Sequence, residues 1–164
     1  MTKPVAAKGP KASRPVMKGY GVPKSLKGAL PWKWAEERLR QSHNYLMITV
    51  RPTGAPHAMP VWGIWLDGGF YFSTSATSRK GRNLARNRRC VVCTEDAAEA
   101  VILEGVAEKL QSKDIPQQAF VDYKAKYKWG LDPKMGPVFA VRPKVVFAMP
   151  EKLFPKGVTR WRFE

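Results

Sequence analysis

Hydroxyl and basic side chains gather between residues 73 and 82. Five of the six positions from Ser73 to Ser78 carry a hydroxyl group, and the basic stretch Arg79-Lys80-Gly81-Arg82 follows at once. Hydroxyl groups donate hydrogen bonds, arginine adds a planar fork of donors, and lysine adds a compact charge. This combination is typical of a phosphate site. The candidate phosphate ligands are Ser73, Ser75, Ser78, Arg79 and Lys80.

An apolar hairpin is expected immediately before this cluster. Its strands are Ala58–Leu66 and Phe70–Ser75, joined by Asp67-Gly68-Gly69. Because glycine adopts positive φ without strain, this connection is typical of a tight turn. Donors and cations at the end of an apolar hairpin suit a phosphate held beside a flat apolar ring. The sequence therefore predicts a cofactor site here and not only a basic surface.

The two cysteines, Cys90 and Cys93, have the spacing of a redox or zinc motif. The β-branched residues between them predict a strand, however, in which side chains three positions apart point to opposite faces. There is no second cysteine pair, and the only histidines are His43 and His57. We therefore expect no metal site and interpret both thiols as core residues. No triad, carboxylate pair or phosphate-binding glycine motif is present either, so no catalytic acid or base is assigned.

The formal net charge of +16 over 164 residues is extreme, and much of it lies at the N-terminus. Residues 1–28 hold seven basic residues and no acidic one. Their composition predicts a disordered or loosely attached tail that could bind nucleic acid or another polyanion. Residues 29–164 are expected to form one domain. Because no apolar run approaches the roughly 20 residues of a membrane helix and no secretory signal is recognised, we expect a cytoplasmic protein with no membrane partner.

Short strands at regular spacing, with helices inserted, predict a mostly β fold: a β-barrel with helical decorations. Helices are expected at Trp32–Ser42, Lys80–Asn87 and Asp114–Lys128. Besides the hairpin, the expected strands are Asn44–Val50, Cys90–Thr94, Val101–Leu110, Val138–Met149 and Thr159–Phe163.

Ala58–Leu66 is apolar on both of its faces. One face should meet the barrel core, and the other should meet a second subunit or a bound ring. Pro60 cannot donate to a strand ladder, so it predicts a bulge or a sheet edge near the start of this strand.

Several of these segments resemble the pyridoxamine 5′-phosphate oxidase-like split-barrel flavoproteins. The resemblance is carried by PHAMPVWGIW at residues 56–65, FSTSATSRKGRNL at 72–84 and LEGVAEKL at 103–110. The closing TRWRF is similar to a bacterial subgroup that includes the deazaflavin-dependent reductases. Together they cover roughly residues 32–164. The resemblance implies a six-stranded antiparallel split barrel of the FMN-binding type, which forms a homodimer with two cofactors at the subunit interface.

The resemblance also assigns roles to residues. A comparable serine–arginine–lysine–glycine turn holds the FMN phosphate in the family, which gives that role to Ser78-Arg79-Lys80-Gly81. Met59, Pro60, Val61 and Trp62 match the strand beneath the flavin ring, and strand alternation predicts that either Met59 and Val61 or Pro60 and Trp62 contact it. The turn favours FMN, whereas the basic charge suits the acidic tail of the deazaflavin coenzyme F-420. The cofactor is therefore FMN or F-420.

The implied function is that of a flavin- or deazaflavin-dependent oxidoreductase, which transfers a hydride between the cofactor and an unknown small molecule. The chain lacks the longer C-terminal arginine pattern of the vitamin B6 oxidases and has only Arg160-Trp161-Arg162, so that substrate is not expected. The alternatives are a non-catalytic flavin or haem carrier, and a polyanion-binding protein that uses the tail or residues 79–89. His57 is interpreted as structural. Core packing is favoured over a substrate pocket for four aromatic residues, Tyr123, Tyr127, Trp129 and Trp161.

Overall fold

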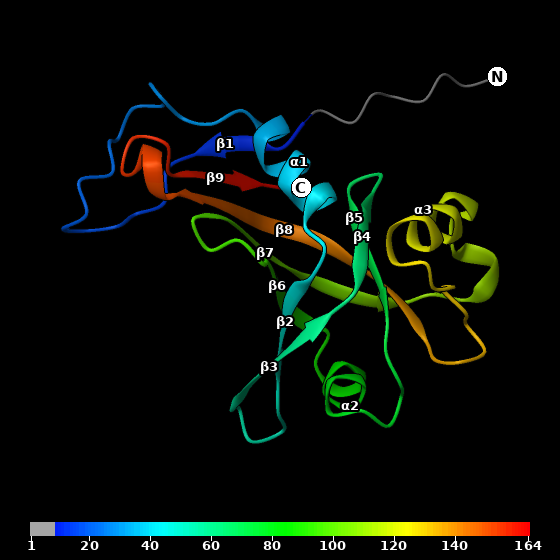
Figure 1. The fold of residues 1–164 in the computed structure, drawn as a ribbon. Helices are drawn as coiled ribbons and strands as arrows, with labels where there is room; N and C mark the ends of the chain where they lie inside the picture. Colours follow the sequence, from blue (N-terminus) through cyan, green and yellow to red (C-terminus); the bar gives the residue numbers. More distant parts are fainter. Residues whose placement is uncertain (1–8) are drawn as a thin grey trace.

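Residues 9–164 are described by the computed structural model of the chain (Figure 1). They form an antiparallel sheet with three α-helices placed around it. The elements are β1 (Lys11–Ser13), α1 (Trp32–Gln41), β2 (Tyr45–Val50), β3 (Pro56–Val61), β4 (Gly63–Leu66), β5 (Gly69–Ser73), α2 (Arg79–Arg86), β6 (Arg89–Thr94), β7 (Glu99–Lys109), α3 (Gln117–Tyr127), β8 (Val138–Pro150) and β9 (Thr159–Arg162). Single 3₁₀ turns precede α3 at Ser112–Asp114 and β9 at Glu151–Leu153.

The sheet curls into a barrel that does not close. Its strand order is β1-β9-β8-β7-β6-β2-β3, and the β4–β5 hairpin joins through β5 to β8. β8 pairs with β7 along most of its length, while its first part also pairs with β5 and its last part with β9. No ladder joins β3 to β4 among the described residues, so the barrel is split there. The expected split-barrel architecture is confirmed, with nine strands in the described residues instead of six.

The predicted strand Ala58–Leu66 is in fact two strands. β3 pairs with β2, and β4 pairs with β5. The chain passes from one to the other at Gly63, where a Cβ atom would lie 2.2 Å from Cζ of Phe70. Only glycine allows the backbone to come this close to the Phe70 ring. Pro60 lies on β3, which is an edge strand, as the missing N–H predicts.

Two apolar clusters form the core. The larger one lies between the inner face of the sheet, α1 and α2, and includes Leu39, Met47, Leu84 and Trp161. The smaller one lies between α3 and the β4–β5 hairpin, and includes Ile64, Tyr71, Ala119 and Tyr123. Each helix therefore contributes its apolar side to one cluster and leaves polar residues to solvent.

The cysteines occupy opposite faces of β6, as strand alternation predicts. Cys90 is buried, and Cys93 is half-buried on the other side. Burial raises the pKa of the Cys90 thiol to about 12 and also raises the pKa of Cys93. Both thiols are therefore protonated at neutral pH, in agreement with a structural role.

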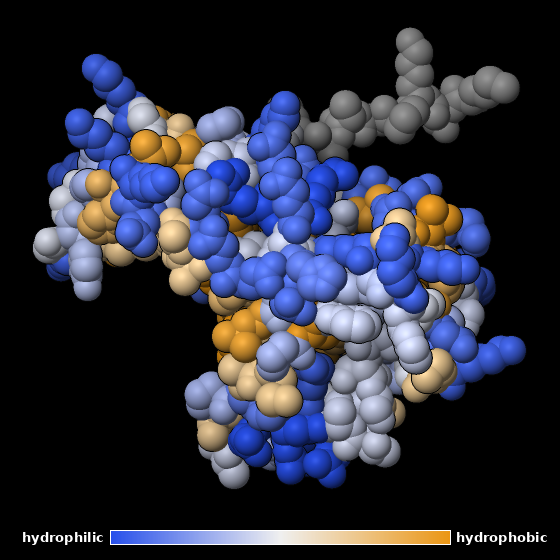
Figure 2. Space-filling view, viewed as in Figure 1, coloured by the Kyte–Doolittle hydropathy of each residue, from blue (hydrophilic) through white to orange (hydrophobic). Residues whose placement is uncertain are grey.

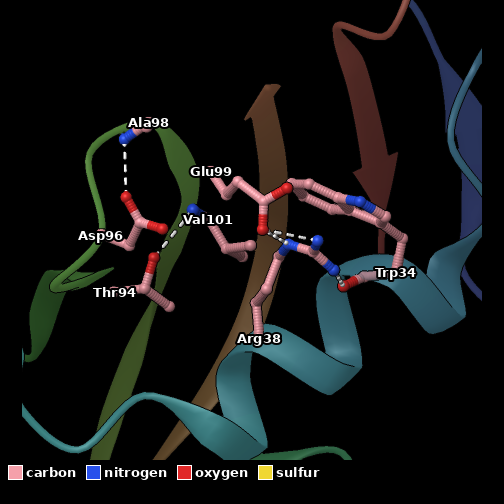
Figure 3. Close-up of polar contacts among 7 residues, drawn as sticks. All are labelled: Trp34, Arg38, Thr94, Asp96, Ala98, Glu99 and Val101. Carbon is pink, nitrogen blue, oxygen red and sulfur yellow. Dashed lines mark hydrogen bonds and ion pairs between the residues drawn. The ribbon is translucent and has the colours of Figure 1, made fainter. Parts of the chain in front are cut away.

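Helix α1 is held against the sheet by Arg38 (Figure 3). The Arg38 guanidinium donates to Oε2 of Glu99 on β7, at 3.0 Å from Nε and 2.6 Å from Nη2. It also lies 3.6 Å from the ring centroid of Trp34 and donates to the Trp34 carbonyl. This contact fixes α1 to the beginning of β7, far from the hydroxyl and basic cluster.

Part of the expected tail is built into the sheet, which differs from the disordered segment that its composition predicts. Residues 1–8 lie outside the described residues. Residues 11–13 form β1 and pair with β9. The Arg14 guanidinium donates to the carbonyls of Ser25, Lys27, Lys156 and Val158, so it ties residues 14–28 to the loop between β8 and β9. Among the described residues, no helix has the length and apolar character needed to cross a membrane.

Candidate functional site

The hydroxyl cluster builds the N-terminus of α2. Oγ of Ser78 accepts a hydrogen bond from the Gly81 N–H, 2.9 Å away, and therefore caps the helix. The same hydroxyl donates to the Ser75 carbonyl at 2.8 Å. Gly81 packs so tightly on this turn that a Cβ atom would lie 2.2 Å from the Ser75 carbonyl oxygen. The serine and the glycine of the Ser-Arg-Lys-Gly turn therefore fix the backbone that carries Arg79 and Lys80.

The other two serines differ in solvent exposure and in the hydrogen-bond partners of their hydroxyl groups. Ser73 is half-buried, and its hydroxyl is 3.2 Å from the Pro137 carbonyl and 3.4 Å from that of Gly136. Ser75 is exposed, and its hydroxyl lies 2.9 Å from that of Thr77. The O–H groups of Ser73 and Ser78 are thus directed at main-chain carbonyls. Ser75 is the exposed serine of the three, and its hydroxyl also accepts a hydrogen bond from the Thr77 N–H at 3.2 Å.

Arg79 and Lys80 begin α2, and neither makes an ion pair with a described acidic residue. Nζ of Lys80 lies 3.4 Å from the Pro60 carbonyl oxygen on β3. Partial burial lowers the pKa of the Lys80 ammonium. The first N–H groups of a helix have no partner within the helix, so they add to the positive character of this end.

His57 lies in the same positive environment. Its Nδ1 is 3.2 Å from Nη2 of Arg51. Desolvation lowers the pKa of His57, and the charges of Arg51, Lys80 and Arg79 lower it further. The neighbouring cations therefore favour the neutral imidazole of His57.

The four residues expected beneath the ring are divided between different environments. The register of β3 with β2 places Met59 opposite Met47 and Val61 opposite Tyr45, on the inner face of the sheet. Val61 is buried, whereas Met59 is 47% exposed. Pro60 lies opposite Leu46 on the outer face and turns its carbonyl to Lys80. Trp62 lies at the break between β3 and β4, where its ring stacks on Tyr127 with centroids 4.8 Å apart.

The outer face of the sheet carries many apolar side chains, with the charged residues Glu104, Arg160 and Arg162 among and beside them, and no helix of residues 9–164 packs on it. Strand register places six apolar side chains on it in adjacent strands, and all are exposed or half-buried: Leu46, Ile48, Val91, Ile102, Val145 and Phe147. Figure 2 shows apolar residues over the β2–β3 region and strongly hydrophilic residues over α2 beneath it. The apolar surface and the cationic turn therefore adjoin at β3.

Sequence reasoning missed one functional candidate, Lys126 on α3. Its Nζ lies 2.8 Å from the Tyr45 hydroxyl and 3.1 Å from the Gly63 carbonyl. Desolvation lowers the pKa of Lys126 to about 8, against an opposing effect of Glu95.

Of the four aromatic residues considered for a substrate pocket, Tyr123, Tyr127 and Trp161 are buried, as packing predicts, and Trp129 is 57% exposed.

The open barrel, together with the Lys80–Pro60 contact between α2 and the edge strand β3, defines a split-barrel protein. The sequence profile of the pyridoxamine 5′-phosphate oxidase family matches residues 33–149, and the chain belongs to that family. The expected family membership is thus confirmed. No curated protein matches the sequence significantly.

Solved structures share the fold at low sequence identity. A haem-binding protein from Mycobacterium smegmatis is 24% identical over 73% of this chain, with a TM-score of 0.61, and this chain spans 55% of its length. An F420 reductase is 20% identical over 80% of this chain and 98% of its own, with a TM-score of 0.56. A FAD-binding protein from Mesorhizobium loti is 14% identical over 82% of this chain and 96% of its own, with a TM-score of 0.57. At these identities the likeness shows the fold alone.

Proposed function

We propose that this protein is an oxidoreductase that transfers a hydride between bound FMN or F-420 and a small molecule. The contact between Nζ of Lys80 and the Pro60 carbonyl carries the proposal. It brings the predicted phosphate turn against the strand predicted to lie beneath the ring, although the two residues are 20 positions apart. A phosphate and a flat ring belong to one cofactor only if their sites adjoin in this way.

The donors present fit a phosphate. Arg79 and Lys80 supply two cations without a carboxylate partner, and the first turn of α2 adds main-chain N–H groups. Ser75 adds an exposed hydroxyl. Ser73 and Ser78 support the turn through their carbonyl contacts, so their part in phosphate binding is indirect. When bound, a flavin or deazaflavin ring supplies the hydride chemistry, and the protein orients and desolvates it.

Of the four residues expected to line the ring, Met59 lies on the same inner face as His57, and its side chain is exposed. It therefore offers side-chain contact to the ring, while Pro60 offers its backbone. The apolar outer face and the exposed Trp62 fit a second copy of the chain, so the working unit in this proposal is a homodimer. This arrangement would exclude water from the ring, which strengthens electrostatic interactions with the cofactor.

The test is a titration of cofactor-stripped protein with FMN and with F-420, followed by absorbance and fluorescence. Tight binding of one compound identifies the cofactor, and binding of neither overturns the proposal.

The double variant Arg79→Ala/Lys80→Ala should weaken cofactor binding about a hundredfold or more, because two charge-assisted contacts are lost. Arg88→Ala/Arg89→Ala is the matched control, since it removes the same charge beyond the C-terminus of α2. Equal loss in both variants would show a general charge effect instead of a site.

Haem binding without turnover is the second candidate, and His57 favours it. A neutral imidazole can ligate iron, and nearby cations suit the two haem propionates. One structural neighbour is a haem-binding protein. Haemin titration of wild type and His57→Ala tests this: a Soret band that depends on His57, with no flavin binding in wild type, would support the haem candidate. No band in wild type would eliminate it.

Polyanion binding through residues 1–28 is a separate property in this proposal. Arg14 is occupied by carbonyl groups, but Lys11, Lys18, Lys24 and Lys27 are exposed. Replacing these four lysines with glutamine should flatten the salt dependence of DNA binding, because fewer counterions are released. An unchanged slope would place any such activity elsewhere in the chain.

A further inference from the structure

The break between β3 and β4 is held from α3 by the hydroxyl of Tyr127. The Gly63 N–H donates to this oxygen at 2.9 Å. The hydroxyl in turn lies 2.7 Å from the carbonyl oxygens of both His43 and Gly63, to either of which it can donate. Gly63 has left the β3 ladder and stands at the start of β4, so Tyr127 satisfies backbone groups where the ladder changes partner.

Lys126, the residue before Tyr127, also contacts the backbone at Gly63. Its ammonium lies 3.1 Å from the Gly63 carbonyl, 2.8 Å from the Tyr45 hydroxyl on β2 and 3.4 Å from the Arg40 carbonyl at the end of α1. It also lies 4.7 Å from the ring centroid of Tyr45 and 5.3 Å from that of Tyr127. One side chain thus links α3 to α1, β2 and the start of β4.

The ring of Tyr127 sets the orientation of Trp62. The two rings are nearly parallel, with an interplanar angle of 10°. Trp62 is 42% exposed, and within residues 9–164 the stack on Tyr127 is its aromatic contact. Trp62 is the last residue of the segment 59–62. Pro60 of the same segment contacts the cationic turn, because its carbonyl oxygen accepts from Lys80.

We propose that Lys126 and Tyr127 are positioning residues of the cofactor site, which fix the β3–β4 break and the orientation of Trp62. The inference rests on the cofactor function proposed above. Within residues 9–164, the side-chain hydrogen bonds that leave α3 come from these two residues, while Gln118 and Lys128 bond within or beside their own helix. The rest of α3 packs by apolar contact on the smaller core cluster. Lys126 and Tyr127 are therefore the polar connection between α3 and the segment that would lie beneath the ring.

The test uses three variants and a control. Lys126→Met removes the donors but keeps a long side chain, and Tyr127→Leu removes both the hydroxyl and the stack. Lys126→Arg keeps a charged donor and serves as the conservative rescue. Lys124→Met is the matched control, because Lys124 is exposed on the same helix and its side chain makes no described hydrogen bond.

Two readouts separate positioning from general stability. Acrylamide quenching of Trp62, obtained by subtracting the same variant in a Trp62→Phe background, needs no cofactor. The dissociation constant of whichever cofactor wild type binds is the second readout. We expect Lys126→Met and Tyr127→Leu to increase the quenching of Trp62 and to weaken cofactor binding about tenfold. Lys126→Arg should recover most of the binding, and Lys124→Met should match wild type.

The outcomes distinguish this inference from the proposed function. If wild type binds neither FMN nor F-420, the proposed function fails. If cofactor binds but Lys126→Met and Tyr127→Leu leave both readouts at the level of Lys124→Met, the positioning role is overturned. Should Tyr127→Leu not fold, Tyr127→Phe replaces it: this variant keeps the stack and loses only the hydroxyl, so binding should weaken while Trp62 stays protected.

Discussion

Gly81 is the residue on which the geometry of the cationic turn most directly depends. A Cβ atom there would lie 2.2 Å from the Ser75 carbonyl and 3.1 Å from that of Ala76, and both are backbone atoms that can yield only if the turn moves. We expect Gly81→Ala to destabilise the protein by about 1–3 kcal/mol and to weaken cofactor binding with it. Urea unfolding measures the first effect. Gly130→Ala is the control, because no atom lies within 4 Å of its added Cβ, and equal losses in the two variants would contradict this account.

Lys126 makes stability depend on pH with a definite sign. Its pKa is about 8 in the folded protein and 10.5 for the ordinary group, so between these values the unfolded chain binds more protons than the folded one. Below pH 8, the cost of burying the charged ammonium reduces the free energy of unfolding in full. As the pH increases from about 8 towards 10.5 this cost is relieved, so the free energy of unfolding rises. The difference in unfolding free energy between wild type and Lys126→Met should shift in favour of wild type between pH 8 and 10. The raised pKa of the two cysteines is common to both proteins and cancels in this difference. A difference that stays constant with pH would refute the assignment.

Among the elements, the strand from residue 11 to 13 depends on one side chain outside it. Arg14 donates to four carbonyls from two separate loops, and hydrogen bonds to a charged group contribute about 1.5–3 kcal/mol each. Arg14→Ala should therefore release residues 14–28 and speed tryptic cleavage after Lys18, Lys24 or Lys27. Lys11→Ala removes the same charge three residues earlier and makes no such contact. Mass spectrometry of timed digests gives the rates, and equal rates in the two variants would show that Arg14 does not hold the segment.

Helices and most strands follow from local patterns, whereas the attachments between distant segments do not. The helix at Trp32–Gln41 and the strands that form β6 to β9 lie within a few residues of their predicted bounds, because periodicity is a local property. The sequence gives no sign that the strand divides into β3 and β4 at Gly63, because both halves are apolar. The order of residues 9–28 was hidden as well, since Arg14 finds partners such as Lys156 at a separation of 142 residues.

The candidate site shows the same limit. The Ser-Arg-Lys-Gly turn could be recognised from the sequence because capping and charge are local features. Its contact with Pro60 and the location of Lys126 on α3 depend on how the barrel curls. A lysine with Lys124 and Lys128 two positions away on either side gives no signal in the sequence that it alone is half-buried.

At the scale of the whole molecule, the outer sheet face is the surface through which the proposed homodimer would form. Leu46 lies on this face in β2, next to the edge strand, is 41% exposed, and pairs with Pro60 on one side and Cys93 on the other. A face of this kind, with partly exposed apolar side chains on the four adjacent strands β2, β6, β7 and β8, is typical of an interface. The edge strand of this face is β3, so a partner bound here would adjoin the proposed cofactor site.

Leu46→Asp tests this arrangement, because a buried carboxylate without a partner opposes association. Sedimentation equilibrium should show a dimer for wild type and a monomer for the variant, and cofactor binding should weaken in parallel if the partner encloses the ring. Val121→Asp is the control: Val121 is 54% exposed on α3, away from the outer face, and its variant should remain dimeric and bind normally. A monomeric wild type that still binds cofactor would contradict the shared site. A dimer that persists in Leu46→Asp would show that the copies associate through another surface, and the outer face would then be free for a different partner.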